Sequence, residues 1–357
     1  MKRWFATILS SIVLLALLAP VETAEAQETP EPEDVETKKR AQTGMKFLQI
    51  PADPRAVAMG NAVTASDDGS SRSLFHNPAT MARTDNRFDV SFMNMEYIAG
   101  ISYNYGSAMY QPANGQYGVI GAHVQSVDYG EVIRTIRANN EKGFQDVGTY
   151  KPSALSIGLG YARNVTDRFT VGGQIKFLQQ DMGAHVTALS ASDPADEDEP
   201  LAVDVGVDEF SESVIGYDFG IVYDTGFRSL RFAMSTRNFA PEFTYVEQNV
   251  EIPLTFRVGL QMDLMDLTPA SADMHSLIAS VEGRRPRDFS EQVRFGGEYS
   301  FMNLVSLRAG YAYPNEDAAR GLSLGGGINY EYQGIGIRAD YANTDMGIFD
   351  DVNRIGV

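Results

Sequence analysis

The chain has 357 residues and a formal net charge of −18 at pH 7, and it contains four histidines and no cysteine. The absence of cysteine excludes thiol catalysis, disulfides and thiolate metal sites. No two histidines are close in sequence, so we expect no His-based metal centre and no cofactor. The acidic charge argues against nucleic acid as a partner, because such binding depends on Lys and Arg that neutralise phosphates.

Residues 1–26 have the features of a signal peptide. A basic start precedes a mostly apolar run at 8–19, and Ala24-Glu25-Ala26 fits the small-x-small cleavage rule. The run is shorter than the roughly 20 residues of a spanning helix, which favours export over membrane anchoring. The mature chain is expected to begin at Gln27, and residues 27–43, charged and containing Pro, are expected to form a flexible leader.

Residues 44–85 mix apolar side chains with Pro, Gly and Ser and show no long alternation. This pattern predicts short helical turns and loops.

From residue 86 onward, apolar and polar side chains alternate. In the segment 168–178, Phe169 and Ile175 fall on one face and Gln174 falls on the other. A period of two predicts strands, because successive side chains point to opposite faces. We expect about fourteen strands, each near the roughly 9–11 residues that a tilted strand needs to cross a bilayer. They lie near 87–96, 99–111, 116–128, 153–163, 168–180, 212–224, 229–239, 253–266, 274–283, 290–301, 303–313, 320–331, 334–343 and 351–357.

The expected connections alternate in length, as the short periplasmic turns and longer outer loops of transmembrane barrels do. Tight turns are expected near 115–116, 165–167, 225–227, 302–303 and 333–334, and longer loops near 129–152, 181–211, 240–252, 284–289, 314–319 and 344–350. Two connections depart from this scheme: the one at 266–273 is long for its side, and the outer one near 97–98 is short.

A soluble β-sandwich would also alternate, but its apolar face would form the core. The polar faces favour a barrel with a polar interior, because they carry charges at matched depth. These charged residues are Asp218, Arg257, Arg294, Glu298, Arg308 and Asp340. Tyrosines near the expected strand ends would form an aromatic girdle, namely Tyr97, Tyr110, Tyr129, Tyr313 and Tyr330. We therefore predict an all-β fold, with an antiparallel transmembrane β-barrel over residues 86–357 in contact with the lipid of a bacterial outer membrane.

Several segments resemble one family. Its opening is matched by Phe47-Leu-Gln-Ile, Pro54-Arg-Ala-Val-Ala-Met-Gly, Ser73-Leu-Phe-His-Asn-Pro-Ala and Tyr97-Ile-Ala-Gly-Ile-Ser-Tyr. These segments closely resemble the start of PorV/PorQ-type outer-membrane proteins, which are relatives of the FadL hydrophobe transporters. The resemblance covers roughly residues 44–357, where Tyr161-Ala-Arg-Asn-Val-Thr-Asp-Arg-Phe-Thr-Val-Gly-Gly, Leu307-Arg-Ala-Gly-Tyr and Asp340-Tyr-Ala also fit.

The resemblance implies a barrel of about fourteen strands in which residues 44–85 fold inside as a plug. The PorV-like branch implies a role in type IX secretion, where the barrel receives exported cargo proteins and passes them to an attachment complex. The FadL-like branch implies uptake of hydrophobic small molecules through a lateral opening. Such barrels usually finish on an aromatic residue, whereas this chain finishes at Asn353-Arg-Ile-Gly-Val357, which puts closure by the last strand in doubt.

The first candidate site is a plug motif. Pro78 disfavours helix at Asn77, whose side chain can hydrogen-bond to the neighbouring backbone and shape a turn. Structural anchoring of the plug is therefore favoured over direct contact with a ligand, and His76 is expected to be a polar plug residue. The motif comprises Phe75, His76, Asn77, Pro78, Ala79, Met59 and Gly60.

The second candidate site is an acidic loop. Clustered carboxylates could bind calcium, but no Asp-x-Asp-x-Asn-Gly spacing is present. A solvated outer loop is favoured, and docking of a partner is the next alternative. The candidate residues are Asp193, Asp196, Glu197, Asp198 and Glu199.

No catalytic motif is recognisable: the sequence has no Gly-x-Ser-x-Gly elbow, phosphate loop or Ser–His pair. The interior charges are expected to neutralise one another across neighbouring strands. We therefore expect a protein that is not an enzyme, with two alternative functions and, as a weaker third alternative, a purely structural porin-like role. A secretion partner should have a blocked lumen and an outer face that binds protein, whereas a channel for hydrophobic molecules should have a continuous apolar track through the plug.

Overall fold

The computed structural model describes residues 43–66, 68–137, 141–191, 203–245, 248–268, 274–314, 321–347 and 351–357. The expected signal peptide and the expected leader up to residue 42 lie outside these residues. The acidic-loop candidates Asp193, Asp196, Glu197, Asp198 and Glu199 lie outside them as well. None of the helices in the described ranges has the length and apolar character of a membrane-spanning helix.

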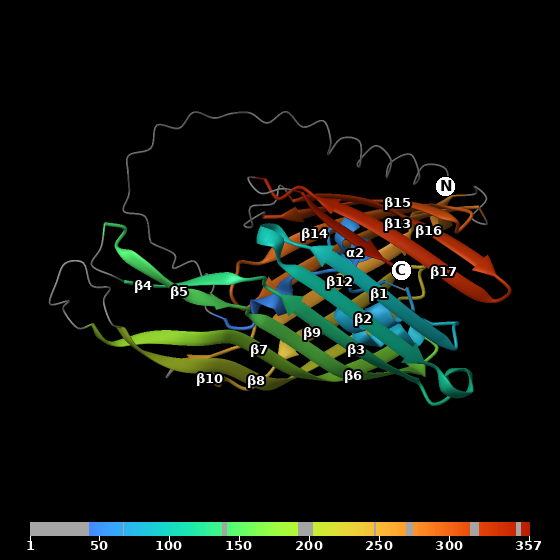
Figure 1. Cartoon of the computed structure of the whole chain (residues 1–357). Coiled ribbons are helices and arrows are strands. Elements are labelled where there is room, and N and C mark those ends of the chain that lie inside the picture. Colours follow the sequence, from blue (N-terminus) through green and yellow to red (C-terminus); the bar gives the residue numbers. More distant parts are fainter. Residues whose placement is uncertain are drawn as a thin grey trace, which may run out of the picture. The chain divides into compact units, whose positions relative to one another are not determined.

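Fourteen antiparallel strands form a closed barrel (Figure 1). They are β1 (Phe88–Glu96), β2 (Ser102–Tyr110), β3 (Val119–Asp128), β6 (Ser153–Thr166), β7 (Phe169–Ala191), β8 (Val203–Asp224), β9 (Arg231–Phe239), β12 (Thr255–Asp263), β13 (His275–Pro286), β14 (Gln292–Phe301), β15 (Val305–Tyr313), β16 (Leu322–Tyr332), β17 (Ile335–Thr344) and β18 (Val352–Gly356). Each overlaps one of the predicted segments, so the predicted fold class is confirmed.

The barrel closes between its last strand and its first. Met93 pairs with Gly356 and Met95 pairs with Arg354, so β18 runs antiparallel to β1. On its other side β18 pairs with β17, where Asp340 lies opposite Gly356. The doubt that the sequence raised about closure is therefore settled in favour of a closed barrel.

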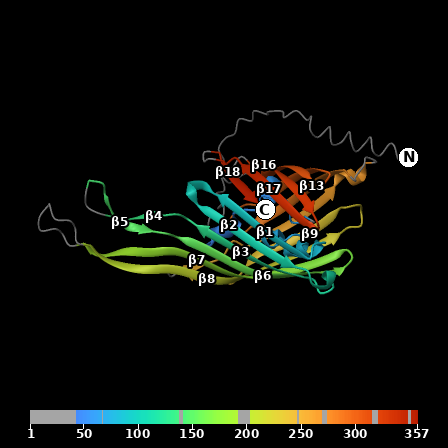
Figure 2. The same cartoon turned by 45° about the vertical axis from the view of Figure 1, so that its right-hand side comes forward.

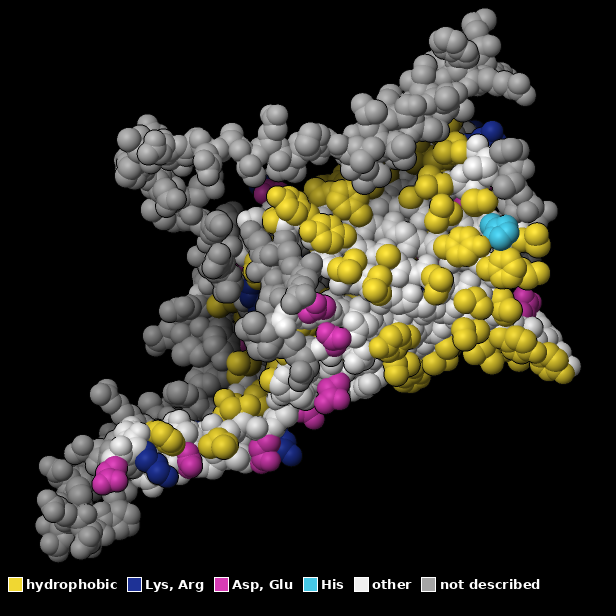
Figure 3. Space-filling view, turned by 90° about the horizontal axis from the view of Figure 1, so that it is seen from above, with side chains coloured by type: hydrophobic (Ala, Val, Ile, Leu, Met, Phe, Trp, Pro, Cys, Tyr) yellow, Lys and Arg dark blue, Asp and Glu magenta, His cyan; other side chains and the backbone are white. Residues whose placement is uncertain are grey.

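The apolar rows face outward, as predicted. On β1, Phe88, Val90 and Phe92 are 63–71% exposed. Hydrophobic side chains likewise cover the strands of the face shown in Figure 3. The charged residues predicted for the interior are all buried, namely Asp218, Arg257, Arg294, Glu298, Arg308 and Asp340. A sandwich would bury the apolar rows instead, so this arrangement excludes it.

The aromatic girdle is confirmed only in part. Tyr313 and Tyr330 are exposed on the outer surface. Tyr97 and Tyr129 pack against an interior apolar cluster that includes Phe47. Their prediction as girdle residues is wrong, because the plug brings apolar side chains to the barrel mouth and gives these rings a partner inside.

Three of the expected long loops contain strands. The β7–β8 pairing continues to Ala191 and Val203, so much of the expected loop 181–211 is strand. The prediction failed because the thickness of a bilayer limits the buried part of a strand and not the hydrogen-bonded ladder outside it. The other two loops form hairpins, β4 (Val132–Arg137) with β5 (Phe144–Tyr150) and β10 (Phe243–Tyr245) with β11 (Gln248–Val250). The β4–β5 and β7–β8 hairpins project beyond the barrel (Figures 1 and 2).

Short helices between Lys46 and Arg83 lie inside the barrel. They are η1 (Lys46–Gln49), α2 (Pro54–Ala58), η2 (Ser71–Phe75) and η3 (Pro78–Arg83), while η4 (Ile98–Gly100), η5 (Pro112–Gly115) and η6 (Leu264–Leu267) lie in connections between strands. Helix η3 contacts β6, β7 and β8, and α2 contacts β15, β16 and β17 across the lumen. The N-terminal segment therefore folds as a plug, as in FadL-type barrels.

Inward-facing glycines allow the plug to approach the wall closely. A Cβ atom on Gly310 would lie 1.8 Å from the backbone nitrogen of Gly60. On the opposite wall, a Cβ atom on Gly172 would lie 2.6 Å from the backbone of Ala79. These distances leave no room for any side chain, so the wall and the plug are in contact through their backbones.

Candidate functional site

Asn77 is the centre of the plug motif and is fully buried. Its Oδ1 accepts a hydrogen bond from the amide of Ala79 at 3.1 Å and so caps η3. Its Nδ2 donates to the carbonyl of Thr64 at 2.9 Å and to that of Ile221, on the wall, at 3.3 Å. One side chain thus joins two plug segments to β8, and Pro78 occupies the first helical position after it.

The other motif residues lie in two groups. Phe75 packs edge-on against Tyr105, with ring centroids 5.1 Å apart, and against His123 at 5.0 Å. Gly60 lies on the opposite side of the plug, close to Gly310. Phe75 to Ala79 therefore form one cluster, and the structure does not bring Met59 and Gly60 to it. The motif as a whole attaches the plug to both walls.

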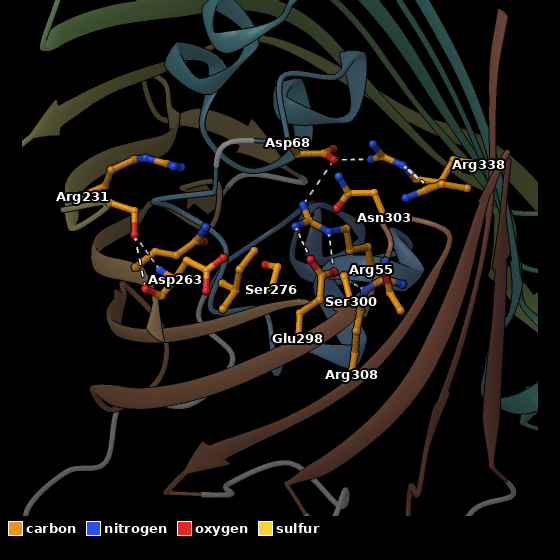
Figure 4. A pocket seen from close by; sticks show the side chains of 15 residues that line it. Arg55, Asp68, Arg231, Asp263, Ser276, Glu298, Ser300, Asn303, Arg308 and Arg338 are labelled. Atoms are coloured by element: carbon orange, nitrogen blue, oxygen red, sulfur yellow. Dashed lines mark hydrogen bonds and ion pairs between the residues drawn. The ribbon is translucent and has the colours of Figure 1, made fainter. Parts of the chain in front are cut away.

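A second set of residues, which sequence reasoning did not select, joins the plug to the wall through charges. Arg55 of α2 makes a bidentate pair with Glu298 of β14, with Nε–Oε2 2.9 Å and Nη2–Oε1 3.0 Å. Its Nη1 lies 3.3 Å from Oδ1 of Asp68. Figure 4 shows Arg55 between these two carboxylates, with Arg338 of β17 on the far side of Asp68.

The same charges continue along the wall. Arg308 of β15 bonds to Glu298 and, at 2.7 Å, to Asp340 of β17. Arg72 of η2 donates to the other oxygen of Asp340 at 2.7 Å and lies 3.5 Å from Asp53. We call these residues the plug–wall charge network: Arg55, Arg72, Arg308 and Arg338 with Asp53, Asp68, Glu298 and Asp340. Its four positive and four negative groups balance, as expected for interior charges that neutralise one another.

The ionisation of the plug carboxylates is strongly favoured. Burial would raise the pKa of Asp53, but Arg72 and the hydrogen bond from His76 outweigh it and hold that pKa at about 2. Burial would likewise raise the pKa of Asp68, but the positive charges of Arg338 and Arg72 outweigh burial and hold that pKa well below its ordinary value. Burial lowers the pKa of His76 despite its 3.0 Å contact with Asp53, so His76 is neutral at pH 7.

Two cavities lie at opposite ends of the plug. The inner cavity, of about 280 Å³, lies near the short turns, and its walls include Asn303, Asp263 and Arg231. Its charged lining is mixed, with three carboxylates and four arginines: Asp68, Asp263, Glu298, Arg55, Arg231, Arg308 and Arg338. By the usual orientation of such barrels, the short turns face the periplasm.

The outer cavity, of about 410 Å³, lies near the longer loops, between the plug and strands β12 to β18. Its apolar lining includes Ile50, Val57 and Met346. Its charged lining consists of Lys46, Arg257, Arg284, Arg294 and Arg354, with no Asp or Glu among the described residues that line it. Residues of the plug–wall charge network line the inner cavity and not the outer one, so the apolar lining of the outer cavity does not continue into the inner cavity among the described residues.

The described part of the chain contains no group of three or more His, Asp or Glu placed to hold a metal ion. Sequence reasoning missed Asp53, Arg55, Asp68 and Arg72 as a set, although all lie in the predicted plug. A signal was present, because charged residues in a segment otherwise built for burial need partners. The wall partners of Arg55 and Arg72 lie more than 200 residues away, and only the folded barrel identifies them.

Comparisons with known proteins agree with this architecture. The toluene transporter TbuX of Ralstonia pickettii matches 85% of this chain and 96% of its own, with 16% identity and a TM-score of 0.53. A FadL homologue of Pseudomonas aeruginosa matches 86% and 96%, with 13% identity and a TM-score of 0.50. The monoaromatic hydrocarbon channel CymD matches 85% and 94%, with 12% identity and a TM-score of 0.50. At such identities the likeness shows the fold alone.

A match to a protein family shows more than the fold alone. No curated protein matches the chain. Residues 33–271, more than half of the chain, match the family described as type IX secretion system protein PorV. With its closed fourteen-strand barrel and internal plug, this outer-membrane protein therefore belongs to the PorV family of the type IX secretion system.

Proposed function

We propose that this protein receives exported proteins at the outer membrane and passes them to further subunits of the type IX system. The observation that carries the proposal is the occupied lumen. The plug is fixed to two wall strands, β14 and β17, by ion pairs of the plug–wall charge network, and it touches the wall through backbone contacts at Gly310 and Gly172. A barrel whose interior is filled in this way is suited to binding partners at its surface, and in this proposal it catalyses no covalent reaction.

The separation of the two cavities supports the same function. A hydrophobic solute that passed from the outer cavity to the inner one would meet buried ion pairs such as Arg55–Glu298, which line the inner cavity. Passage of an apolar molecule would require these ion pairs to separate, and each buried ion left without its partner costs roughly several kcal/mol.

The projecting hairpins supply a surface for protein partners. Strands β7 and β8 have 23 and 22 residues, whereas β1 has 9. On the neighbouring β4–β5 hairpin, Ile133 and Phe144 are 64% and 45% exposed. Exposed apolar side chains beyond the barrel are typical of protein contacts. We assign cargo or a secretion subunit to this surface, and the candidates Asp193 to Glu199 fall between β7 and β8 in the sequence.

The proposal includes the segment boundaries. Residues 1–26 direct export and are removed, 27–43 link the signal to the plug, 44–85 form the plug and 86–357 form the barrel. The contact of Thr43 with Asp288, at 3.1 Å, supports a plug that starts near this residue.

A genetic complementation experiment tests the proposal. In cells lacking the gene, cargo proteins should be released or accumulate in the periplasm, and the wild-type gene should restore attachment. The double variant Ile133→Asp/Phe144→Asp should insert into the outer membrane normally but restore attachment poorly. Leu267→Asp introduces the same kind of change at an exposed site near the short turns and should restore attachment fully.

A second function, as a channel for hydrophobic small molecules, is favoured by one observation. The outer cavity has an apolar part, and TbuX and CymD, whose folds are similar, are named as a toluene transporter and a monoaromatic hydrocarbon channel. Cells without the gene would then keep normal cargo attachment and lose uptake of labelled toluene. That result would replace the proposed function with the channel.

A further inference from the structure

The apolar belt on the outside of the barrel is tall on one side. Exposed large apolar side chains run along β16 from Leu322 to Tyr332, the whole 11 residues of the strand. On β15 they run from Val305 to Tyr313, all 9 residues. A tilted strand needs about 9–11 residues to cross a bilayer, so the belt on this side matches the full hydrocarbon thickness.

The belt is shorter along the strands where the barrel closes, β18, β1, β2 and β3, which we call the closing seam. On β1 the exposed large apolar side chains reach only from Phe88 to Phe92, five of the 9 residues of the strand. On β3 they reach only from Ile120 to Val124, five of its 10 residues. With a rise of about 3.4 Å per residue and a tilt of about 45°, five residues cover roughly 10 Å of bilayer and nine cover roughly 20 Å.

Polar side chains follow the short belt on the outward face of the seam. They form adjacent rows, because Asn94 pairs with Asn104 across β1 and β2, and Asn104 pairs with Ser126 of β3. In the next row Glu96 pairs with Ser102 in the same way. We call the set the seam polar strip: Asn94, Glu96, Ser102, Asn104, Ser126, Asp128 and Asn353.

The strip lies at the height of hydrocarbon-facing residues on the other side of the barrel. Glu96 is eight positions from Phe88, at the inner end of β1, and Leu324 is eight positions from Tyr332, at the inner end of β16. A flat bilayer that matched β15 and β16 would therefore surround Glu96 with hydrocarbon, where an outward-facing charge is unfavourable. A bilayer adapts to a short apolar stretch by becoming thinner, at modest cost.

The strip is suited to lipid headgroups and water. Its amides hydrogen-bond to one another or to neighbours on the same surface: Asn94 donates to Asn104 at 2.9 Å, and Asn343 of β17 donates to Asn353 at 3.1 Å. The rim is also low here, because only residues 97–101 connect β1 to β2. Little wall remains above the strip against which a second protein could pack, so a lowered membrane surface is favoured.

We propose that the outer membrane is thinned beside the closing seam, so that the seam polar strip contacts headgroups and water at a height where β15 and β16 contact hydrocarbon. The inference goes beyond the proposed function, since it concerns the bilayer next to the barrel and requires no cargo. A thinner hydrocarbon layer lowers the barrier for a polar segment that crosses the membrane beside the seam.

Spin labels at matched heights test the proposal. The chain has no cysteine, so Glu96→Cys and Leu324→Cys each place one nitroxide on the full-length protein. In liposomes of palmitoyl-oleoyl phosphatidylcholine, collisions with oxygen report hydrocarbon and collisions with a water-soluble nickel chelate report the aqueous side. The label at 96 should favour the nickel chelate and the label at 324 should favour oxygen, with depths that differ by roughly 10 Å.

Phe88→Cys and Tyr332→Cys at the inner ends are the matched controls. Their labels should lie at equal depths, because thinning at the outer ends leaves the inner ends unchanged. A label at 88 that lies deeper than the label at 332 would show a tilted barrel and would overturn the proposal. Oxygen contact at 96 equal to that at 324 would show a flat bilayer and would overturn it as well. In native outer membranes, exclusion of both reagents from the label at 96 would assign the strip to a protein partner instead.

A variant that extends the belt tests the cause. Asn94→Leu/Asn104→Leu replaces the hydrogen-bonded pair of the strip by apolar side chains. A label on Ser126→Cys should favour the nickel chelate in the otherwise unchanged chain and shift toward oxygen in this background. Absence of the shift would show that the strip does not set the bilayer thickness. Cargo attachment in cells is a separate readout, so failure of this inference leaves the secretion role standing.

Discussion

The two ends of the plug differ in how the buried charges around them are paired. At the inner end, each arginine of the plug–wall charge network contacts a carboxylate. Arg55, for example, binds both carboxylate oxygens of Glu298 through its Nε and Nη2 atoms. At the outer end, Arg257 faces Arg284, and no carboxylate lines the cavity among the described residues. Two arginines of the inner set, Arg55 and Arg72, come from the plug, whereas Arg257 and Arg284 of the outer set lie on neighbouring strands of the wall.

The comparison separates charges that attach the plug from charges that do not. Paired buried charges with complete hydrogen bonds fix one element to another, and breaking one pair leaves an uncompensated charge. Buried like charges weaken the fold and are compatible with stability only when the rest of the protein provides it. We therefore expect removal of an arginine to be costly at the inner end and nearly neutral at the outer end.

The largest effect is expected from Arg55→Gln. The substitution leaves Glu298 and Asp68 short of a cation in a buried setting, which should lower the free energy of unfolding by about 3–5 kcal/mol. Chemical unfolding in detergent and protease cleavage of the plug measure this loss. Arg163→Gln, at an exposed position of β6, is the control and should change neither. An Arg55 variant as stable as the control would show that the network does not hold the plug.

Gly310→Ala tests the backbone contact next to the network. The new Cβ would overlap the backbone of Gly60, which cannot rotate away, so we expect a loss of about 1–3 kcal/mol from overpacking. Gly336→Ala is the control, because a Cβ there would have no atom within 4 Å. Similar melting temperatures for the two variants would contradict a tightly seated plug.

Asn77→Ala should destabilise the plug by about 1–2 kcal/mol, since it removes a helix cap and two hydrogen bonds to backbone carbonyls. Asn77→Asp keeps the oxygen that caps η3 and loses the donor to Thr64 and Ile221. Unfolding of the two variants therefore separates the cap from the attachment to the wall. Equal stability of Asn77→Ala and the wild type would disprove the anchoring role.

Acidification should loosen the plug in two stages. The pKa of His76 is lowered on folding, so its contribution is complete above the unfolded value of about 6.5 and declines as the pH falls below it. The lowered pKa of Asp53 gives a contribution that is present above its ordinary 3.8 and is lost as the pH falls toward about 2. Unfolding measured from pH 8 to pH 2 should show both stages, and His76→Gln should reduce the upper one. A flat curve from pH 7 to pH 5 would refute the role of His76.

The smallest effect is expected from Arg284→Gln. Relief of the like-charge pair with Arg257 should change stability by only about 0.2–1 kcal/mol, in the stabilising direction. Chemical unfolding of Arg284→Gln and Arg55→Gln under the same conditions compares their free energies of unfolding. A loss as large as that of Arg55→Gln would show that the outer arginines are structural, and the comparison would fail.

Local sequence patterns predicted the barrel well and its outer parts less well. All fourteen strands of the barrel appear where alternation placed them, because a wall between lipid and a polar interior imposes a period of two on every strand. The extension of β7 and β8 past the expected loop was missed, since outside the bilayer no apolar face is required. The outward placement of Tyr97 and Tyr129 was wrong because their partners come from the plug.

The candidate site was predicted only as a segment. The sequence predicted a turn around Asn77 that anchors the plug, and in the structure Asn77 caps η3 ahead of Pro78. The partners of Arg55 and Arg72 could not be read from the sequence, because Glu298 and Asp340 lie more than 200 positions away.

The sequence by itself determined the strands, their order and the two faces of the wall, since each of these follows from the alternation of neighbouring side chains. Only the tertiary structure decided which interior charges meet an opposite charge on the neighbouring strand and which meet a like charge. That outcome depends on register: Glu298 falls opposite Arg308, whereas Arg257 falls opposite Arg284. A shift of pairing changes the partner without changing a single residue, so the charge pattern of the lumen belongs to the folded barrel.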